Sequence, residues 1–498
     1  MKSAGEDSQR RLSDYSRRTF LLGACGTAVG SSLLGCKASD SWFMFGALAP
    51  SSTEAPIELT GPAAKYTPVI KMTFVRRKGP YGIRWPGAIY DGEAALRNYL
   101  QQIKSTAKEL GVELIIRPAP IYSPAQADEW VAEAQKEKPD GLLVVLLDRQ
   151  EHSWPTAYKA IESKIPTVVF APIGAAFTTN TRRIPDKTGS FICSTDDFSQ
   201  TAYGMKMIKA GAKLREMRFI VIAGEKRMDR MIKHFGTKLR YLPAGTFLDE
   251  YNKTPIDNQV QLLATQYMRN ATRISGPTRQ DVLNGIKSYV VARNILKREQ
   301  GDGITMDCLG ALRSVKVSLP CIAWSKMLDR GIPAACEADL EACVTHALVQ
   351  YLFDRPGFQQ DPVPETASGC LVGSHCSCPT RLNGISQRPE SYYLSHHHGM
   401  RDAVPRTMWQ VGQRVTVADV LLSKKDDVPP SMIISAGTVV NNVSVPPSGG
   451  CVVAVTLKLD GVNELLDYPG FHQLFFYGDY KKELREYCQL FGIKPIVV

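Results

Sequence analysis

The sequence has no block of lysine and arginine and no repeat that interleaves basic and aromatic residues. Its formal net charge is +11 over 498 residues, but the excess is spread along the chain. Proteins that bind nucleic acid usually gather their basic residues on one face or in one tail. We therefore expect no nucleic-acid partner, and a solvated surface with an excess of basic residues explains the charge.

The apolar run near the N-terminus is too short and too rich in glycine for a comfortable membrane span, which needs about 20 predominantly apolar residues. This stretch, SRRTFLLGACGTAVGSSLLGC, instead begins with the paired Arg17 and Arg18, as twin-arginine export signals do. It ends in LLGC, which resembles a lipoprotein processing site and makes Cys36 a candidate for lipidation. We expect residues 1–36 to be a signal, and the protein to be exported and either periplasmic or anchored to a membrane through Cys36.

The twelve cysteines do not show the paired spacing of a structural zinc site. Most lie within apolar strand or helix patterns, where cysteine acts as a small buried hydrophobe, so few or no disulfides are expected. A zinc site is suggested by a group of nearby residues: His375, Cys376, Cys378, His396, His397 and His398. However, their CxC spacing is unusual for zinc and no second cysteine pair follows at the expected distance. A plain strand and loop is the better interpretation.

After residue 36, changes in composition and hydrophobic pattern divide the chain into segments. Residues 37–67 are rich in Ser, Pro, Ala and Gly and predict a linker. In residues 68–200, apolar strands such as GLLVVLL alternate with helices, which indicates a parallel sheet covered on both faces. The motif SPAQ at residues 123–126 predicts a helix start. The expected strands are Val69–Val75, Val112–Arg117, Gly141–Leu147 and Pro166–Ala171.

A second α/β domain is predicted for residues 201–358, with a long helix at Gln280–Arg298. Its expected strands are Arg218–Ala223, Leu239–Leu242 and Gly303–Cys308. In residues 359–498 the sequence changes to β-branched runs broken by Pro and Gly, which predicts a mostly β C-terminal domain. A final helix is expected after Asp479 and ends at Gly492.

The stretch IPAACEADLEACVTHALVQYL places Glu337 and Asp339 at a strand-to-helix turn. Asp339 suits a helix N-cap, whereas glutamate is a mediocre one, so Glu337 needs another explanation. Three further residues stand at the edges of expected elements: Asp361 in GFQQDP, His375 in GSHCSCP and His472 in PGFHQLFFYGD. Two carboxylates with one or two histidines suit Mn²⁺, or a similar divalent metal, with an open coordination position.

From about residue 68 to its end, the chain resembles the L-fucose/L-arabinose isomerase family. The resemblance lies in the segments GDGITMDC, PAACEADLEA, FQQDP, GSHCSCP and FHQLFFYGDYKKELREYCQLFGI. It implies two Rossmann-like α/β domains followed by a mostly β domain, assembled as homo-trimers or homo-hexamers. It also implies an Mn²⁺-dependent aldose–ketose isomerase for a small sugar, with its active site between the second and third domains and often completed by a neighbouring subunit.

The resemblance also implies roles for individual residues. Glu337 matches a glutamate that is both metal ligand and acid/base, Asp361 a second acidic ligand and His472 a histidine ligand. His375 matches a further histidine that arabinose isomerases use. His398 is a candidate substrate contact, because its histidine run falls where the family bears substrate-facing loops.

The chemistry requires such a set. Aldose–ketose interconversion moves a proton between C1 and C2 through an enediol, whose two oxygens gain negative charge. A divalent metal stabilises that charge, and a carboxylate moves the proton. Glu337 and Asp361 are the expected catalytic residues. The alternative is an exported, non-catalytic sugar-binding protein built on the same fold, because family members with known activity are cytoplasmic.

Overall fold

A computed structural model of the chain describes residue 54 and residues 57–81, 90–149, 152–184, 187–312, 317–397, 401–425, 427–443, 453–462 and 464–498. The expected export signal, Cys36 and His398 lie outside these residues. Within the described residues, no helix combines the length and the apolar character needed to cross a membrane.

The first sheet is entirely parallel, in the order β2-β1-β3-β4-β5, which is one of the orders found in doubly wound folds. Its strands are β1 (Val69–Val75), β2 (Glu113–Ile116), β3 (Gly141–Leu146), β4 (Thr167–Ala171) and β5 (Ser190–Ser194). Its helices are α2 (Gly92–Leu110), α3 (Pro124–Glu137), α4 (Ser153–Glu162), α5 (Thr178–Thr181) and α6 (Ser199–Glu216). Four of the strands and the start of α3 confirm the sequence prediction, whereas β5 was not predicted.

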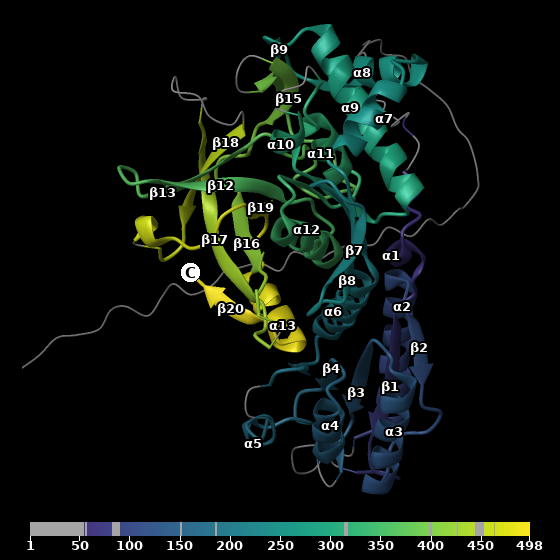
Figure 1. Cartoon of the computed structure of the whole chain (residues 1–498). Helices are drawn as coiled ribbons and strands as arrows, with labels where there is room; N and C mark the ends of the chain where they lie inside the picture. Colours follow the sequence, from purple (N-terminus) through teal and green to yellow (C-terminus); the bar gives the residue numbers. More distant parts are fainter. Residues whose placement is uncertain are drawn as a thin grey trace, which may run out of the picture. The chain divides into compact units, whose positions relative to one another are not determined.

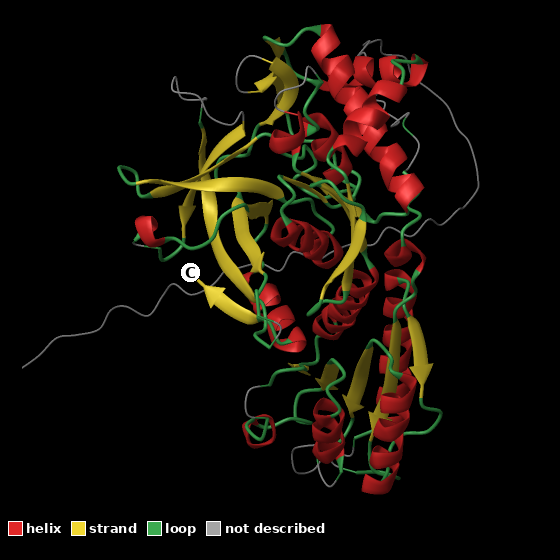
Figure 2. Ribbon diagram, in the orientation of Figure 1, coloured by secondary structure: helices red, strands yellow, loops and turns green. Residues whose placement is uncertain are grey.

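Alternation along β3 explains why this sheet is covered on both faces. Leu143 and Val145 join one apolar cluster with residues of α2 and α6. Leu142, Val144 and Leu146 join another with residues of α3 and α4. Successive side chains of a strand point to opposite faces, so a continuous apolar run requires cover on both sides. Figure 2 shows the strands with helices beside them.

The second sheet has the order β11-β10-β6-β8-β7, in which only β7 is antiparallel to its neighbour. Its strands are β6 (Arg218–Ile222), β7 (Met228–Ile232), β8 (Thr237–Leu242), β10 (Gly303–Met306) and β11 (Ala334–Cys336). The accompanying helices are α7 (Gly245–Lys253), α8 (Asn258–Asn270), α9 (Arg279–Glu299), α10 (Cys308–Leu312), α11 (Cys321–Leu328) and α12 (Leu340–Phe353). The expectation of further α/β structure is confirmed.

The C-terminal part is mainly antiparallel β-structure, as predicted. Its sheet runs β16-β19-β12-β13-β18-β17-β20, and an additional pairing of β16 with β17 closes it on itself. The strands are β12 (Phe358–Glu365), β13 (Cys370–His375), β16 (Arg414–Leu421), β17 (Ser431–Asn442), β18 (Val453–Leu459), β19 (Gln473–Tyr477) and β20 (Lys494–Val497). A 3-10 turn, η1 (Leu465–Asp467), precedes β19, and α13 (Lys481–Phe491) ends at Gly492 as expected.

A small three-stranded sheet contains segments from both sides of the predicted domain boundary at residue 358. Strand β14 (Tyr392–His397) pairs with both β15 (Arg401–Thr407) and β9 (Ile274–Ser275). Because β9 precedes that boundary and β14 follows it, one sheet contains residues from both expected domains.

Part of the predicted linker is packed. Glu54 forms ion pairs with Lys326 at 3.1 Å and Arg330 at 2.7 Å. The short helix α1 (Pro62–Lys65) directs its first N–H groups at Asp302, whose carboxylate accepts from the backbone of residues 63 and 64. Helix N-termini need such acceptors, so the described part of this segment belongs to the folded unit.

Helix α12 connects the second sheet with the closed sheet. It contacts β10 and β11 on one side and β16 and β19 on the other (Figure 1). Val344 and Leu348 of this helix share an apolar cluster with Phe476 of β19. The N-terminus of α12 is thereby held where the carboxyl ends of β10 and β11 meet the closed sheet.

Candidate metal centre

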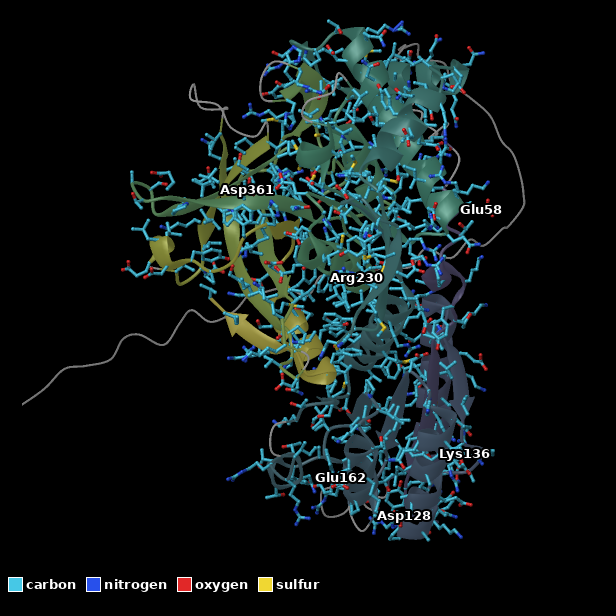
Figure 3. The ribbon with its side chains drawn as sticks, viewed as in Figure 1. Glu58, Asp128, Lys136, Glu162, Arg230 and Asp361 are labelled. Atoms are coloured by element: carbon cyan, nitrogen blue, oxygen red, sulfur yellow. The ribbon has the colours of Figure 1, made fainter. Side chains whose placement is uncertain are left out.

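The structure brings four of the sequence-predicted site residues together. Glu337 directly follows β11, whereas Asp361 lies on β12 (Figure 3), His375 ends β13 and His472 directly precedes β19. Strand β12 lies between β13 and β19 in the closed sheet, so the last three residues come from adjacent strands. The site therefore lies where the carboxyl end of a parallel sheet meets the closed sheet, a common place for ligands in α/β proteins.

The chain reaches Glu337 through an unusual backbone turn. Both Glu337 and Ala338 have positive φ, at 61° and 55°. The N–H of Ala338 donates to the carbonyl of Met306 at 3.0 Å, which ties the turn to β10. Asp339 then caps α12 by accepting from the N–H of Ala342 at 2.9 Å. Left-handed backbone is costly for residues with a side chain and often accompanies functional positions.

Gln359 fixes the strand that leads to Glu337. Its side-chain oxygen accepts from the N–H of Cys336 at 2.8 Å, and its side-chain nitrogen donates to the carbonyl of Cys336 at 3.5 Å. Both residues are buried. A side chain of β12 thus satisfies the buried backbone groups at the unpaired edge of β11, and it fixes Glu337 relative to Asp361, which lies two residues farther along β12.

The polar atoms of the site converge within a few ångströms. Nε2 of His472 lies 3.2 Å from Oδ1 of Asp361 and 3.5 Å from Oε2 of Glu337. Nε2 of His375 lies 3.9 Å from Oε1 of Glu337, and the two imidazole rings are 5.6 Å apart at an angle of 74°. Glu337, His375 and His472 form a group whose donor atoms all lie within 4.8 Å of one another and could hold a metal ion.

Asp339 decides which nitrogen of His472 faces this group. Oδ2 of Asp339 lies 2.8 Å from Nδ1 of His472. An ionised carboxylate can only accept, so Nδ1 carries the proton and donates. Nε2 is then directed at Glu337 and Asp361. This carboxylate–histidine arrangement is typical of metal sites, where the second carboxylate orients the ligand ring.

One atom of the site lacks a hydrogen bond in the described structure. Oδ1 of Asp361 is buried and accepts none, although Nε2 of His472 is only 3.2 Å away. Its ion pair with His472 requires a protonated imidazole, and a cation held by Asp361, Glu337 and the neutral imidazole would take the place of that proton. The residues present therefore fit a divalent metal.

The site faces solvent through its acids and the interior through its histidines. The side chains of Glu337 and Asp361 are 35% and 32% exposed, whereas those of His375 and His472 are 3% and 8% exposed. Phe471, beside His472, is 61% exposed. Two cavities of about 730 and 750 Å³ lie elsewhere, along α13, and none of the four site residues lines them. A small solute would reach the carboxylates directly from solvent.

Burial and charge perturb the groups of the site. Burial raises the pKa of Glu337, the charge of His472 opposes this rise, and the nearby carboxylate of Asp361 adds to it. Burial lowers the pKa of His472, but its interactions with Asp339 and Asp361 outweigh burial and raise that pKa to about 10, so a metal ion would have to displace the proton on Nε2. Burial lowers the pKa of His375 to about 4, which keeps this imidazole neutral and able to act as a ligand near neutral pH.

Sequence reasoning missed three contributors. Asp339 was expected only as a cap, Gln359 was not singled out, and Asp307 lay unnoticed within the segment GDGITMDC. Asp307 follows β10, the neighbour of β11, and its charge contributes to the raised pKa of Glu337. A signal did exist for Asp307, because acids that directly follow adjacent parallel strands meet at one edge of the sheet.

Of the zinc set considered from the sequence, the structure brings Cys376 and His397 together, whereas Cys378 and His396 have other contacts and His398 lies outside the described residues. The thiol of Cys378 contacts the carbonyl of Pro379, and Nδ1 of His396 contacts the carbonyl of Asp402. Of the described cysteines none forms a disulfide. Cys376 and His397 are joined by Cys321, which the sequence did not indicate, because the ends of β13 and β14 lie against the start of α11.

No family model matches the chain, and no curated protein matches it closely enough to count as a relative.

Proposed function

We propose that this protein is a metal-dependent aldose–ketose sugar isomerase of the L-fucose/L-arabinose type, acting through an enediol. The observation that carries the proposal is the convergence of Glu337, Asp361 and Nε2 of His472, with Asp339 holding the histidine ring from behind. The resemblance in sequence around Glu337, Asp361 and His472 supports it.

Glu337, Asp361 and His472 would hold the metal, with His375 as a fourth ligand. Mn²⁺ or a similar divalent ion suits this mixture of oxygen and imidazole donors. When bound, such an ion supplies Lewis-acid stabilisation of negative charge on neighbouring substrate oxygens.

The residues of the chain supply the proton transfer. The raised pKa of Glu337 makes its carboxylate a stronger base than an ordinary glutamate, which suits a group that accepts and returns a proton. The partly exposed carboxylate of Asp361, across the site, serves as the second acid/base group. General acid–base assistance of this kind is typically worth about 10²–10⁴-fold in rate. The exposed ring of Phe471 offers an apolar surface for one face of a sugar.

The remaining expectations complete the proposal. The protein is a homo-trimer or homo-hexamer that takes a small sugar and no nucleic acid. It is exported by the twin-arginine route and is periplasmic or anchored through a lipidated Cys36.

Replacing Arg17 and Arg18 by lysine should retain the precursor in the cytosol, and Cys36→Ala should release a lipid-anchored form into the soluble fraction. Normal export of the double-lysine form would show that Arg17 and Arg18 are not part of a twin-arginine export signal.

The direct test is a screen of aldoses by NMR with Mn²⁺ present, beginning with L-fucose, D-arabinose and L-arabinose. Turnover in deuterated water should label the product carbon, because a carboxylate base exchanges its proton with solvent. Asp361→Asn should lower turnover by about 10²-fold or more. Asp460→Asn is the control, because Asp460 forms an ion pair with Arg414 and belongs to none of the contacts of the site.

Two outcomes would contradict the proposal. Metal-loaded protein that turns over no aldose is not an isomerase of this type. Protein that binds a sugar equally well before and after chelation, and never converts it, would instead be the exported, non-catalytic sugar-binding protein.

A further inference from the structure

A second group of ligand-type side chains lies behind the carboxylate site. Cys321 and Cys376 are buried, with their sulfur atoms 3.4 Å apart. His397 is buried beside them, and the donor atoms of these three residues all lie within 4.8 Å of one another. Cys336, which is also buried, forms another such group with Cys376 and His375. The proposed isomerisation does not use these thiols.

The group is assembled from separate parts of the fold. Cys321 is the first residue of α11, Cys376 directly follows β13 and His397 is the last residue of β14. Cys321 and Cys376 are 55 residues apart in the sequence. A single buried cysteine packs as a small hydrophobe, but two thiols and an imidazole from separate elements within one short distance are the donor set of a metal site.

The spacing of the donors matches a bound ion better than a covalent link. A disulfide requires sulfur atoms about 2.0 Å apart. Two thiolates on one tetrahedral zinc ion, with Zn–S bonds of about 2.3 Å, lie about 3.8 Å from each other. The observed 3.4 Å, at which the Cys321 thiol donates a hydrogen bond to the sulfur of Cys376, excludes a disulfide and is close enough to the second value for both sulfur atoms to bind one ion.

We propose that Cys321, Cys376 and His397 bind a thiophilic d¹⁰ cation, Zn²⁺ or Cu⁺, at a site separate from the carboxylate centre, with Cys336 as a further candidate ligand beside Cys376. Two thiolates and a neutral imidazole balance the charge of Zn²⁺, so a buried site of this composition carries no net charge. Soft sulfur ligands select such ions over Mn²⁺, which prefers oxygen.

The two centres meet at His375. Its Nδ1 lies 3.5 Å from the sulfur of Cys376, whereas its Nε2 lies 3.9 Å from Glu337. An ion on Cys376 would therefore fix one face of this imidazole while the other faces the carboxylate site. The sulfur site joins α11 to the ends of β13 and β14, and it supports an imidazole ring that faces Glu337, one of the proposed catalytic residues.

The test begins with the full chain purified under reducing conditions without chelator. We expect about one equivalent of zinc or copper by elemental analysis, and X-ray absorption should show sulfur neighbours at about 2.3 Å from zinc. Protein loaded with Co²⁺ should show a thiolate-to-metal charge-transfer band in the near ultraviolet. Cys321→Ser and Cys376→Ser should each abolish this band.

The controls separate this site from the carboxylate centre. Cys378→Ser changes a neighbouring buried thiol outside the group and should leave the band intact. Glu337→Gln should lower Mn²⁺ binding, followed by electron paramagnetic resonance, without affecting the band. Unchanged Mn²⁺ binding in Glu337→Gln, with the band intact, would contradict the carboxylate centre alone and leave the sulfur site supported.

Three results would overturn the proposal. The first is a charge-transfer band that persists in both Cys321→Ser and Cys376→Ser. The second is an X-ray absorption spectrum of the wild-type protein in which the metal has only nitrogen and oxygen neighbours, and the third is a Cys321–Cys376 disulfide detected by mass spectrometry in freshly purified metal-free protein. The X-ray absorption measurement needs no variant, so the proposal remains testable if the serine variants do not fold.

Discussion

Asp339 holds His472 through Oδ2 at 2.8 Å while Oδ1 caps α12. One carboxylate therefore sets both the start of a helix and the orientation of an imidazole 133 residues away in sequence. Because α12 is packed between two sheets, the ring is anchored to the core and not to a loop.

Asp339→Asn should weaken Mn²⁺ binding by about 10–100-fold, because the imidazole of His472 loses a charged partner that orients it. Asparagine remains a good N-cap, so the melting temperature should change little. Titration followed by electron paramagnetic resonance measures the affinity. Asp257→Asn is the matched control, since Asp257 caps α8 in the same way through Val260. Equal effects in the two variants would show that Asp339 acts only as a cap.

Metal content should fall when a ligand is removed. We expect about one Mn²⁺ per chain at the carboxylate centre, and less than this in Glu337→Gln and in His472→Ala, since each removes a donor from the proposed set. Chelation should abolish turnover in the wild-type protein. Manganese analysis after dialysis is the measurement, with Asp460→Asn as control. Unchanged manganese content in both variants would eliminate the site.

Gln359→Leu should lower the free energy of unfolding by about 1–3 kcal/mol, because the N–H of Cys336 is left buried without its acceptor. Chemical denaturation measures the loss. Gln261→Leu, at an exposed position of α8, should change stability by no more than about 0.5 kcal/mol. We also expect weaker Mn²⁺ binding in Gln359→Leu, since Glu337 follows Cys336. A stable variant with normal metal binding would refute this positioning role.

Asp419 makes stability depend on pH. This side chain of β16 is 2% exposed, and burial raises its pKa to about 8, helped by Asp339 and Glu341 and opposed by the charge of His472. The folded state therefore retains a proton that the unfolded chain loses near pH 4. The resulting stabilisation is complete below the ordinary pKa and disappears as the pH rises toward 8, by at most about 1.4 kcal/mol per pH unit.

Asp419→Asn should abolish this dependence. Denaturation of chelated protein at pH 5.5, 7 and 8.5 should give a smaller decline for the variant than for the wild-type protein. The exposed Asp427→Asn should follow the wild type. Parallel pH profiles for all three proteins would show that Asp419 does not carry the effect.

Local signals in the sequence account for the elements correctly predicted. The continuous apolar run at β3 and the serine, proline and glutamine at the start of α3 act within a few residues, so they can be recognised without knowing the fold. The closed sheet was predicted only as β-structure, because the pairing of β16 with β17 depends on the arrangement of all the intervening strands. Strand β9 has two residues and exists because β14 lies beside it.

The sequence by itself determined that Glu337 needed a partner, since glutamate caps helices poorly, and that acids and histidines at strand ends could bind a metal. Only the tertiary structure decided that Asp339 orients His472, and that Cys321 lies against Cys376. These contacts join residues 133 and 55 positions apart. The order of the strands in each sheet and the packing of the helices bring such distant residues into contact. The local sequence around one of them does not indicate the other.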